Sequence, residues 1–299
     1  MLKRQEMNSY RTVLSIAGSD SVGGAGIQAD IKTCTALGVC AMTAVTALTA
    51  QNTQGVSRVA VTDPEMLTAQ LRAVADDVRP DAVKTGMLPD AESVELVARF
   101  LKERSLTNVV VDPVMVATSG DSLCEDPART RLLTLLIPLA RVVTPNIPEA
   151  ETLTGIRISD RASMQLAALH LLRHTGCGAV LLKGGHGLER CGHADLLLSG
   201  PRELCGQSGA SGFAEPIWLE HPHIDTPNTH GTGCTLSSAI AANLAKGFSL
   251  EESVERAKEY ISEALAAMLD LGKGSGPMNH AFGLVGKFSE EKLNTKGEL

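Results

Sequence analysis

Apolar residues along the chain form short continuous runs that alternate with longer segments of helical spacing. Each short run is predicted to form a buried strand, and these runs lie at residues 12–17, 82–85, 108–111, 141–144 and 179–183. Helix-start signals stand between them, such as Asp63 followed by Pro64 and Glu65. Strands that alternate with helices indicate a mainly parallel sheet covered on both faces. We therefore predict an α/β fold of three layers, helix, sheet and helix, with residues 1–299 as one domain.

Two segments are predicted to form helices of special interest. Residues 25–37 follow a glycine-rich loop, and their spacing places Ile27, Ile31 and Cys34 on one face. Residues 250–271 have the pattern of a long amphipathic helix.

The remaining pattern predicts strands and tails. Residues 39–50, rich in β-branched residues and alanine, are predicted to form one strand. Residues 56–61 alternate and are predicted to form an edge or lid strand. The ends of the chain, residues 1–10 and 277–299, are expected to be flexible.

Composition excludes several classes of protein. Hydrophobic residues make up 43% of the chain but aromatic residues only 3%, so the core must be built from Ala, Val, Leu and Ile. The net charge of -7, without a basic run, argues against nucleic acid as a partner. The sequence shows no apolar run long enough to cross a membrane, and its polar start does not resemble a signal peptide. The seven cysteines form no C-x-x-C pair, which favours reduced thiols and a cytoplasmic location.

A polar, glycine-rich turn at residues 225–233 leads directly into an apolar helix. Gly231 and Gly233 lack the side chains that would keep a ligand away from the backbone. The first amides of a helix have no partners within it and lie at the positive end of its dipole, so this turn suits a phosphate. Cys234 stands at the same helix start, where a thiol is shifted toward the thiolate and could act as a base or nucleophile. The alternative for this turn is a glycine-rich N-cap with a buried, inert cysteine.

Further polar residues follow the predicted strands. Parallel sheets bind ligands at the carboxyl ends of their strands. Asp112 and Glu149 are carboxylates of the kind that hold Mg²⁺ through water, and Lys183 is placed to reach a phosphate. Gln51 offers a donor and an acceptor side by side, which suits the edge of an aminopyrimidine.

Other nucleotide motifs do not account for this pattern. Residues 24–29 match G-x-G-x-x-A, but no acidic residue occurs between Ile31 and Thr62 to bind the ribose of a dinucleotide. A tight turn into a helix and a substrate loop both remain open for this segment. The sequence contains neither a P-loop nor the protein-kinase motifs.

Taken together, the motifs resemble the hydroxymethylpyrimidine/phosphomethylpyrimidine kinase family of thiamine biosynthesis. The resemblance spans about residues 12–276. It rests on AGSDS at 17–21, GGAGIQAD at 23–30, TALTAQNT at 46–53, KTGML at 84–88, VDPVM at 111–115, TPNIPEA at 144–150, KGGH at 183–186 and NTHGTGCT at 228–235.

The resemblance implies a ribokinase-like fold and two phosphorylations by ATP and Mg²⁺, first of 4-amino-5-hydroxymethyl-2-methylpyrimidine and then of its monophosphate. It implies a pyrimidine pocket formed by Gly18, Asp30, Gln51, Met87 and Val114. It assigns ATP to Asp112, Asn146, Lys183 and Thr232, and Mg²⁺ to Asp112 and Glu149 through water. The catalytic group would be Gly231, Thr232, Gly233 and Cys234, with Cys234 standing where the wider ribokinase group carries Asp.

Two other functions are compatible with these residues. One is a pyridoxal or pyridoxine kinase of the same fold, since both rings carry a hydroxymethyl group. The other is a pyrimidine-binding protein without catalytic activity. In each case we expect a small-molecule ligand and a homodimer, with no nucleic-acid or membrane partner.

Overall fold

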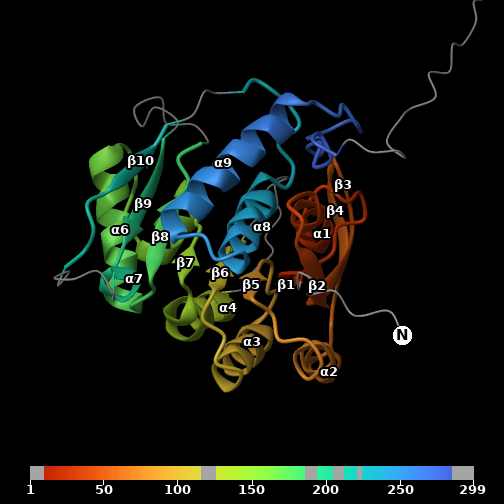
Figure 1. The fold of residues 1–299 in the computed structure, drawn as a ribbon, viewed down its shortest axis with the longest axis horizontal. Coiled ribbons are helices and arrows are strands. Elements are labelled where there is room, and N and C mark those ends of the chain that lie inside the picture. The colour runs from red at the N-terminus through yellow and green to blue at the C-terminus, as the bar shows by residue number, and fades with distance from the viewer. Residues whose placement is uncertain (1–9, 116–125, 186–193, 205–211, 221–223, 285–299) are drawn as a thin grey trace, which may run out of the picture.

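The frame of the molecule is an eight-stranded sheet in the order β10-β9-β8-β7-β6-β5-β1-β2 (Figure 1). The computed structural model describes residues 10–115, 126–185, 194–204, 212–220 and 224–284. The strands are β1 (Thr12–Ala17), β2 (Cys40–Val45), β5 (Ala82–Thr85), β6 (Val109–Val111), β7 (Val142–Val143), β8 (Ala179–Leu182), β9 (Asp195–Ser199) and β10 (Ile217–Leu219). Strands β1, β2, β5, β6, β7 and β8 run parallel, whereas β9 is antiparallel to both of its neighbours. The predicted mainly parallel sheet is confirmed.

Helices cover both faces of this sheet. One face carries α1 (Gly26–Ala36), α8 (Thr232–Ala245) and α9 (Leu250–Ala266), and in Figure 1 α8 and α9 cross in front of the strands. The other face carries α2 (Pro64–Ala75), α3 (Ala91–Glu103), α4 (Asp126–Arg131), α5 (Ile147–Thr154) and α6 (Arg161–Thr175). A π-helical turn (Leu132–Leu136) and a 3₁₀ turn (Ile137–Leu139) follow α4, and the short α7 (Pro201–Leu204) follows β9. None of the described helices is both long and apolar enough to cross a membrane.

Alternate residues of each strand enter different cores. Val110 and Val142 pack in the core that contains α8 and α9, while their neighbours Val111 and Val143 pack in the core on the opposite face. Successive side chains of a strand point to opposite faces, so a strand buried on both sides must be apolar throughout. This explains the continuous valine runs of the sequence and confirms the three layers.

The segment predicted as a single strand at residues 39–50 is two strands. It divides at Thr46, and β3 (Ala47–Asn52) pairs with β4 (Gly55–Val61) in a separate antiparallel sheet. Thr46 is buried, its N–H donates to Ala17 O at 3.0 Å, and its hydroxyl donates to Met87 O at 2.7 Å. Because residues on both sides of the break favour strands, the sequence pattern does not reveal it.

The predicted buried face of α1 is partly wrong. Ile27 and Cys34 are buried, but Ile31 is 38% exposed. Asp30 and Thr33 occupy the buried face in its place. Polar residues in this interface hide it from an argument based on hydrophobic spacing.

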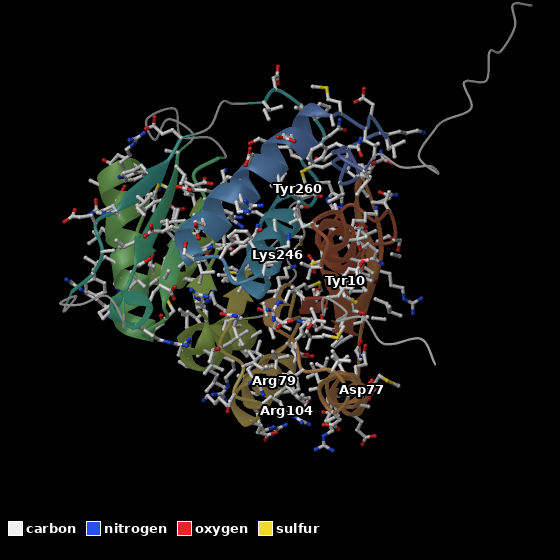
Figure 2. All side chains as sticks on the ribbon, viewed as in Figure 1. Tyr10, Asp77, Arg79, Arg104, Lys246 and Tyr260 are labelled. Atoms are coloured by element: carbon white, nitrogen blue, oxygen red, sulfur yellow. The ribbon has the colours of Figure 1, made fainter. Side chains whose placement is uncertain are left out.

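The end of the chain also differs from expectation. Helix α9 stops at Ala266 instead of continuing to 271, and Met268 and Asp270 have positive φ angles. Within the tail expected from residue 277, Met278 and His280 are buried. Tyr260 of α9, which is labelled in Figure 2, donates its hydroxyl to His280 O at 2.8 Å. Residues 1–9 and 285–299 of the expected tails lie outside the described residues.

Candidate active site

The predicted site residues gather at one edge of the sheet. Gly18 follows β1, Met87 follows β5, Asp112 follows β6, Asn146 follows β7 and Lys183 follows β8. These strands are parallel, so their carboxyl ends meet at the same edge, where open α/β sheets bind ligands. The remaining predicted residues are Asp30 in α1, Gln51 in β3, Val114 beside Asp112, Glu149 in α5 and residues 231–234 at the start of α8.

The start of α8 is fixed by a close backbone contact. Its N-cap is Gly231, with φ +84°, and a Cβ at this position would lie 1.8 Å from Gly24 O. A Cβ at Gly24 would in turn lie 2.5 Å from His230 Cδ2. Only glycine permits this approach, which joins the loop after β1 to the turn before α8.

No side chain caps the start of α8. The helix begins with Thr232, which is partly buried and whose N–H makes a long bond of 3.3 Å to Thr229 O. By contrast, α5, α6 and α9 each begin with a side-chain capping box. The first turn of α8 therefore begins without a side-chain cap, and its role as an anion site stays a prediction.

Asp112 and Lys183 meet in front of this turn. Lys183 Nζ lies 3.1 Å from Asp112 Oδ1, which also accepts from Thr144 Oγ1 at 3.0 Å. A Cβ on Gly233 would lie 3.3 Å from Lys183 Nζ and 3.6 Å from Asp112 Oδ2. The glycine thus keeps a space between the open amides, a cation and a carboxylate.

The pairing of opposite charges decides the protonation states of Asp112 and Lys183. Burial alone would raise the pKa of Asp112, but the charges of Lys183 and then Lys84 outweigh it and lower this pKa. Burial would lower the pKa of Lys183, and Asp112 raises it instead. Both side chains are therefore charged at neutral pH.

Asn146 and Glu149 form the capping box of α5. Asn146 Oδ1 accepts from the Glu149 N–H at 2.8 Å, and Glu149 Oε2 accepts from the Asn146 N–H at 2.8 Å. Burial raises the pKa of Glu149 to about 7, against the opposing charge of Lys183. The oxygen of the Asn146 amide thus serves the cap of α5, and the contact of Asn146 with a nucleotide stays a prediction.

Asp112 and Glu149 fit a magnesium ion that is bound mainly through water and phosphate. Asp112 Oδ2 accepts one bond, from Ser237 Oγ at 3.2 Å, and a carboxylate oxygen has two acceptor sites. Among the described residues, no group of three or more His, Cys, Asp and Glu side chains is placed to hold a metal. Two carboxylates with phosphate and water are the usual ligands of Mg²⁺ in phosphoryl-transfer sites.

Cys234 lies in the first turn of α8 and is a free, partly buried thiol. Burial raises its pKa to about 11, and Lys84 opposes this increase. The expected shift toward the thiolate is therefore wrong for the protein without ligands. The helix start lowers a thiol pKa only while water also solvates the sulfur, and here desolvation dominates.

Three of the residues predicted for the pyrimidine pocket follow strands, namely Gly18 after β1, Met87 after β5 and Val114 after β6. A Cβ at Gly18 would lie 3.0 Å from Met87 Sδ, so these two residues are in contact. Val114 is partly buried, and its N–H donates to Asp112 O at 2.8 Å. The pocket assignment of these residues stays a prediction.

Gln51 of β3 approaches His230, the residue before Gly231. The distance from Gln51 Nε2 to His230 Nε2 is 3.5 Å, and the same His230 nitrogen lies 2.9 Å from Asp20 Oδ2. Asp20 also accepts from the amides of Gly24 at 2.8 Å and Ala25 at 2.7 Å. Gln51 and His230 line a cavity of about 330 Å³, together with the β3–β4 turn and residues 273–275.

Asp30 lies in the interior of the protein. It is fully buried and holds the ammonium of Lys84 at 2.9 and 3.0 Å. The predicted contact of Asp30 with the pyrimidine stays a prediction, and in the protein without ligands this carboxylate is engaged by Lys84.

Sequence reasoning missed Lys84 and Asp20. Lys84 has a detectable signal, because it is a charged residue within an apolar strand run and must be paired when that strand is buried. Asp20 has a weaker signal, since an acid in a glycine-rich loop is common and its partner His230 is distant in sequence.

A model of the family described as phosphomethylpyrimidine kinase matches residues 20–279. The chain belongs to the phosphomethylpyrimidine kinase family. Among curated relatives, the hydroxymethylpyrimidine/phosphomethylpyrimidine kinase of Bacillus subtilis is 46% identical over 97% of this chain and 99% of its own length. As a member of this family the chain is a kinase.

Two solved structures support the same fold. A Bacillus subtilis pyridoxal kinase in an ADP complex has a TM-score of 0.80 at 38% identity, covering 91% of this chain and 98% of that one. A phosphomethylpyrimidine kinase from Clostridium difficile has a TM-score of 0.72 at 39% identity, covering 85% of this chain and 99% of that one. The ribokinase-like fold is thus confirmed.

Proposed function

We propose that this phosphomethylpyrimidine kinase family member transfers the γ-phosphoryl group of ATP to 4-amino-5-hydroxymethyl-2-methylpyrimidine, and then a second one to the monophosphate. The observation that carries the proposal is the space at Gly233, where open helix amides face Lys183 and Asp112 within 4 Å of a hypothetical Cβ. A phosphate fits such a place because it brings the negative charge that amides and an ammonium bind.

Backbone amides and side chains of the protein would have separate roles in the reaction. The amides of Gly231 to Cys234 would stabilise the charge that grows on the transferred phosphoryl group. Lys183 would hold the phosphates of ATP, and the NH₂ group of Asn146 would contact the nucleotide. Phosphoryl transfer depends on such alignment and charge neutralisation more than on covalent chemistry.

Cys234 would accept the proton of the hydroxymethyl group. The alcohol oxygen then forms its bond to the γ-phosphorus while the bond to the leaving oxygen of ADP breaks. The pKa of the thiol is about 11 in the free protein, although Lys84 already opposes the effect of burial, so Cys234 must first release its own proton to solvent and then act as the thiolate. Asp112 and Glu149 would hold Mg²⁺, which when bound neutralises charge on the phosphates.

The decisive experiment is a kinase assay with the pyrimidine alcohol and its monophosphate, run side by side and monitored by ADP release. We expect turnover of both. Pyridoxal forms a third arm, because a pyridoxal kinase is among the structures that this fold matches. A chain that turns over pyridoxal but neither pyrimidine is a pyridoxal kinase, and tight pyrimidine binding without ADP release indicates a binding protein.

The pyrimidine pocket is tested separately with Gln51→Ala. The amide of Gln51 lies at the cavity formed with His230 and residues 273–275, and we propose that it holds the aminopyrimidine edge. The variant should have a higher KM for the pyrimidine with a smaller change in kcat, because the lost contact is made in both ground and transition states. The control is Gln165→Ala, at an exposed glutamine of α6. An unchanged KM would remove Gln51 from the pocket.

We also propose that the protein acts in the cytoplasm as a homodimer. Leu48 is 61% exposed on the small β3–β4 sheet, whose strands pair only with each other among the described strands. Unpaired strand edges and exposed apolar side chains favour association. Light scattering after gel filtration should give twice the chain mass, and Leu48→Lys should shift the protein toward the monomer if this sheet forms the contact.

A further inference from the structure

A fully buried ion pair, Lys84 with Asp30, lies beneath the start of α8. Lys84 of β5 and Asp30 of α1 are both inaccessible to solvent. The Lys84 Nζ atom lies 2.9 Å from Asp30 Oδ1 and 3.0 Å from Asp30 Oδ2. Burying an ammonium is costly unless its surroundings satisfy it, so a charge in this place calls for an explanation.

The carboxylate of this pair is fully engaged. Besides Lys84, Asp30 accepts from Ser15 Oγ at 2.5 Å and from Ser238 Oγ at 2.6 Å. Ser15 belongs to β1 and Ser238 to α8. The group of Ser15, Asp30, Lys84 and Ser238, which we call the Lys84 cluster, therefore ties together two strands and two helices.

The cluster is aligned with Cys234. Ser238 follows Cys234 by four residues in α8, and residues with this spacing lie on the same face of a helix, one turn apart. Cys234 itself is held by the backbone of Gly26 at the start of α1, the helix that carries Asp30. The thiol and the ion pair thus occupy neighbouring turns on one side of α8.

The ammonium of Lys84 retains hydrogen-bonding capacity. Within the described part of the chain, all of its hydrogen bonds go to Asp30, whereas an ammonium has three N–H groups and one carboxylate cannot receive all three in line. A Cβ on Gly86 would lie only 2.9 Å from Nζ, so the glycine keeps the space around the ammonium clear.

We propose that Lys84, held by Asp30, is a positioning residue that supplies the positive charge opposite Cys234 when this thiol gives up its proton. The proposal rests on the proposed function, in which Cys234 accepts a proton from the alcohol. Lys84 acts through Cys234 and does not touch the substrate, because it is fully buried.

The charges that face the sulfur come from several elements. Lys84 of β5 favours the thiolate, whereas Asp30 of α1 and Asp112 after β6 disfavour it, and Lys183 after β8 also interacts with the sulfur. Removing Lys84 must therefore raise the pKa of Cys234, and removing the charge of Asp30 must lower it. The two halves of one ion pair are expected to have opposite effects.

Alkylation by iodoacetamide tests this without nucleotide or substrate, because only the thiolate reacts. The rate at pH 9 is measured for the Cys234 peptide by mass spectrometry in the wild type, Lys84→Met and Asp30→Asn. We expect Lys84→Met to react about tenfold more slowly, as for a pKa increase of about one unit, and Asp30→Asn to react faster. Cys177, which is buried far from this cluster in the sequence and fold, reports opening of the protein in the same samples.

A merely structural cluster gives a different result. Both variants would then loosen the protein and both would label Cys234 and Cys177 faster. The double variant D30N/K84M removes both charges together, so it leaves no uncompensated charge and keeps the test valid if a single variant does not fold. It should react more slowly than the wild type, and an equal or faster rate with Cys177 still protected overturns the proposal.

Kinase kinetics separate this proposal from the proposed function. In Lys84→Met we expect kcat to fall in parallel with the alkylation rate, while the KM for ATP stays within about twofold. A normal alkylation rate with lost activity would overturn the role of Lys84 and leave Cys234 as the base. Full activity of Cys234→Ala would instead overturn the base assignment, whatever the alkylation rates show.

Discussion

The starts of α5 and α8 lie at the same edge of the sheet and are built in opposite ways. The first turn of α5 is closed by Asn146 and Glu149, which satisfy each other's backbone amides at 2.8 Å. The first turn of α8 follows Gly231 and has no side-chain cap. Both turns lie near Lys183. Its charge lowers the pKa of Glu149, and its Nζ would lie 3.3 Å from a Cβ on Gly233.

The difference shows where the molecule leaves hydrogen-bonding capacity for a ligand. Glycine in the N-cap position costs only a few tenths of a kcal/mol compared with a capping side chain, so an open helix start is inexpensive to maintain. A bound phosphate then takes the place of the missing cap. The closed start of α5 instead presents Glu149 in a fixed place, which suits a group that must hold an ion through water.

The largest effect is expected for Cys234→Ala, which removes the one reactive side chain from the open start. Loss of a general base lowers turnover by on the order of 10²-fold or more, so kcat should fall by that amount with little change in KM for ATP. Cys40→Ala, at an exposed cysteine of β2, is the control. A kcat close to that of the wild type would mean that the open turn binds phosphate without supplying a base.

The next effect is expected for Gly231→Ala, which alters the backbone of the open start. The new Cβ would lie 1.8 Å from Gly24 O at a φ of +84°, so strain and overlap together should cost about 2–3 kcal/mol in unfolding free energy and lower kcat/KM for ATP. Gly155→Ala at the C-cap of α5 is a matched control, with φ +71° and no atom within 4 Å of the new Cβ.

In that control we expect only the cost of the left-handed conformation, about 1–2 kcal/mol, and unchanged kinetics. Urea unfolding and steady-state assays of both variants make the comparison. If Gly155→Ala impaired kcat/KM as strongly as Gly231→Ala, stability alone would explain the loss, and the contact with Gly24 would have no special role.

Much of this arrangement follows from sequence. Continuous valine runs predict strands buried on both faces, and parallel strands bring residues as distant as Asp112 and Lys183 to one edge. The glycines at 231 and 233 predict an open helix start because their absence of side chains is directly visible. Local rules are sufficient for these features.

Features that depend on long-range contacts were not predictable in this way. The predicted shift of Cys234 toward the thiolate is wrong, because the desolvation of the sulfur depends on how α1 packs over the helix start. The break at Thr46 and the burial of Asp30 against Lys84 depend likewise on partners distant in sequence. Polar residues in a core need specific partners, and hydrophobic spacing carries no information about them.

Glu149, in the capped first turn of α5, should make the unfolding free energy depend on pH. Burial raises its pKa from 4.5 to about 7, so the folded protein binds this proton more tightly than the unfolded chain does. The wild type therefore loses stability as pH rises from about 4.5 to about 7, and the loss persists at higher pH. Glu149→Gln cannot titrate and keeps an oxygen acceptor for the Asn146 amide.

Between pH 5 and pH 8, the unfolding free energy of Glu149→Gln relative to the wild type should rise by about 2–3 kcal/mol. Urea unfolding at the two pH values measures this difference, in which effects independent of pH cancel. The control is Glu92→Gln, an exposed acid in the first turn of α3. A difference that is the same at both pH values would show that Glu149 is ionised in the folded protein throughout this range.

The smallest effect is expected at Asn146, where the cap and the proposed nucleotide contact can be separated. Asn146→Ala loses the bond to the Glu149 amide, so its unfolding free energy should fall by about 1 kcal/mol. Asn146→Asp keeps an acceptor for the same amide and should recover most of that stability. Both variants lose the NH₂ group, so the KM for ATP should rise in both, and more in Asp, whose charge repels phosphate. An unchanged KM in both would confine Asn146 to capping α5 and leave ATP to Lys183 and the open turn of α8.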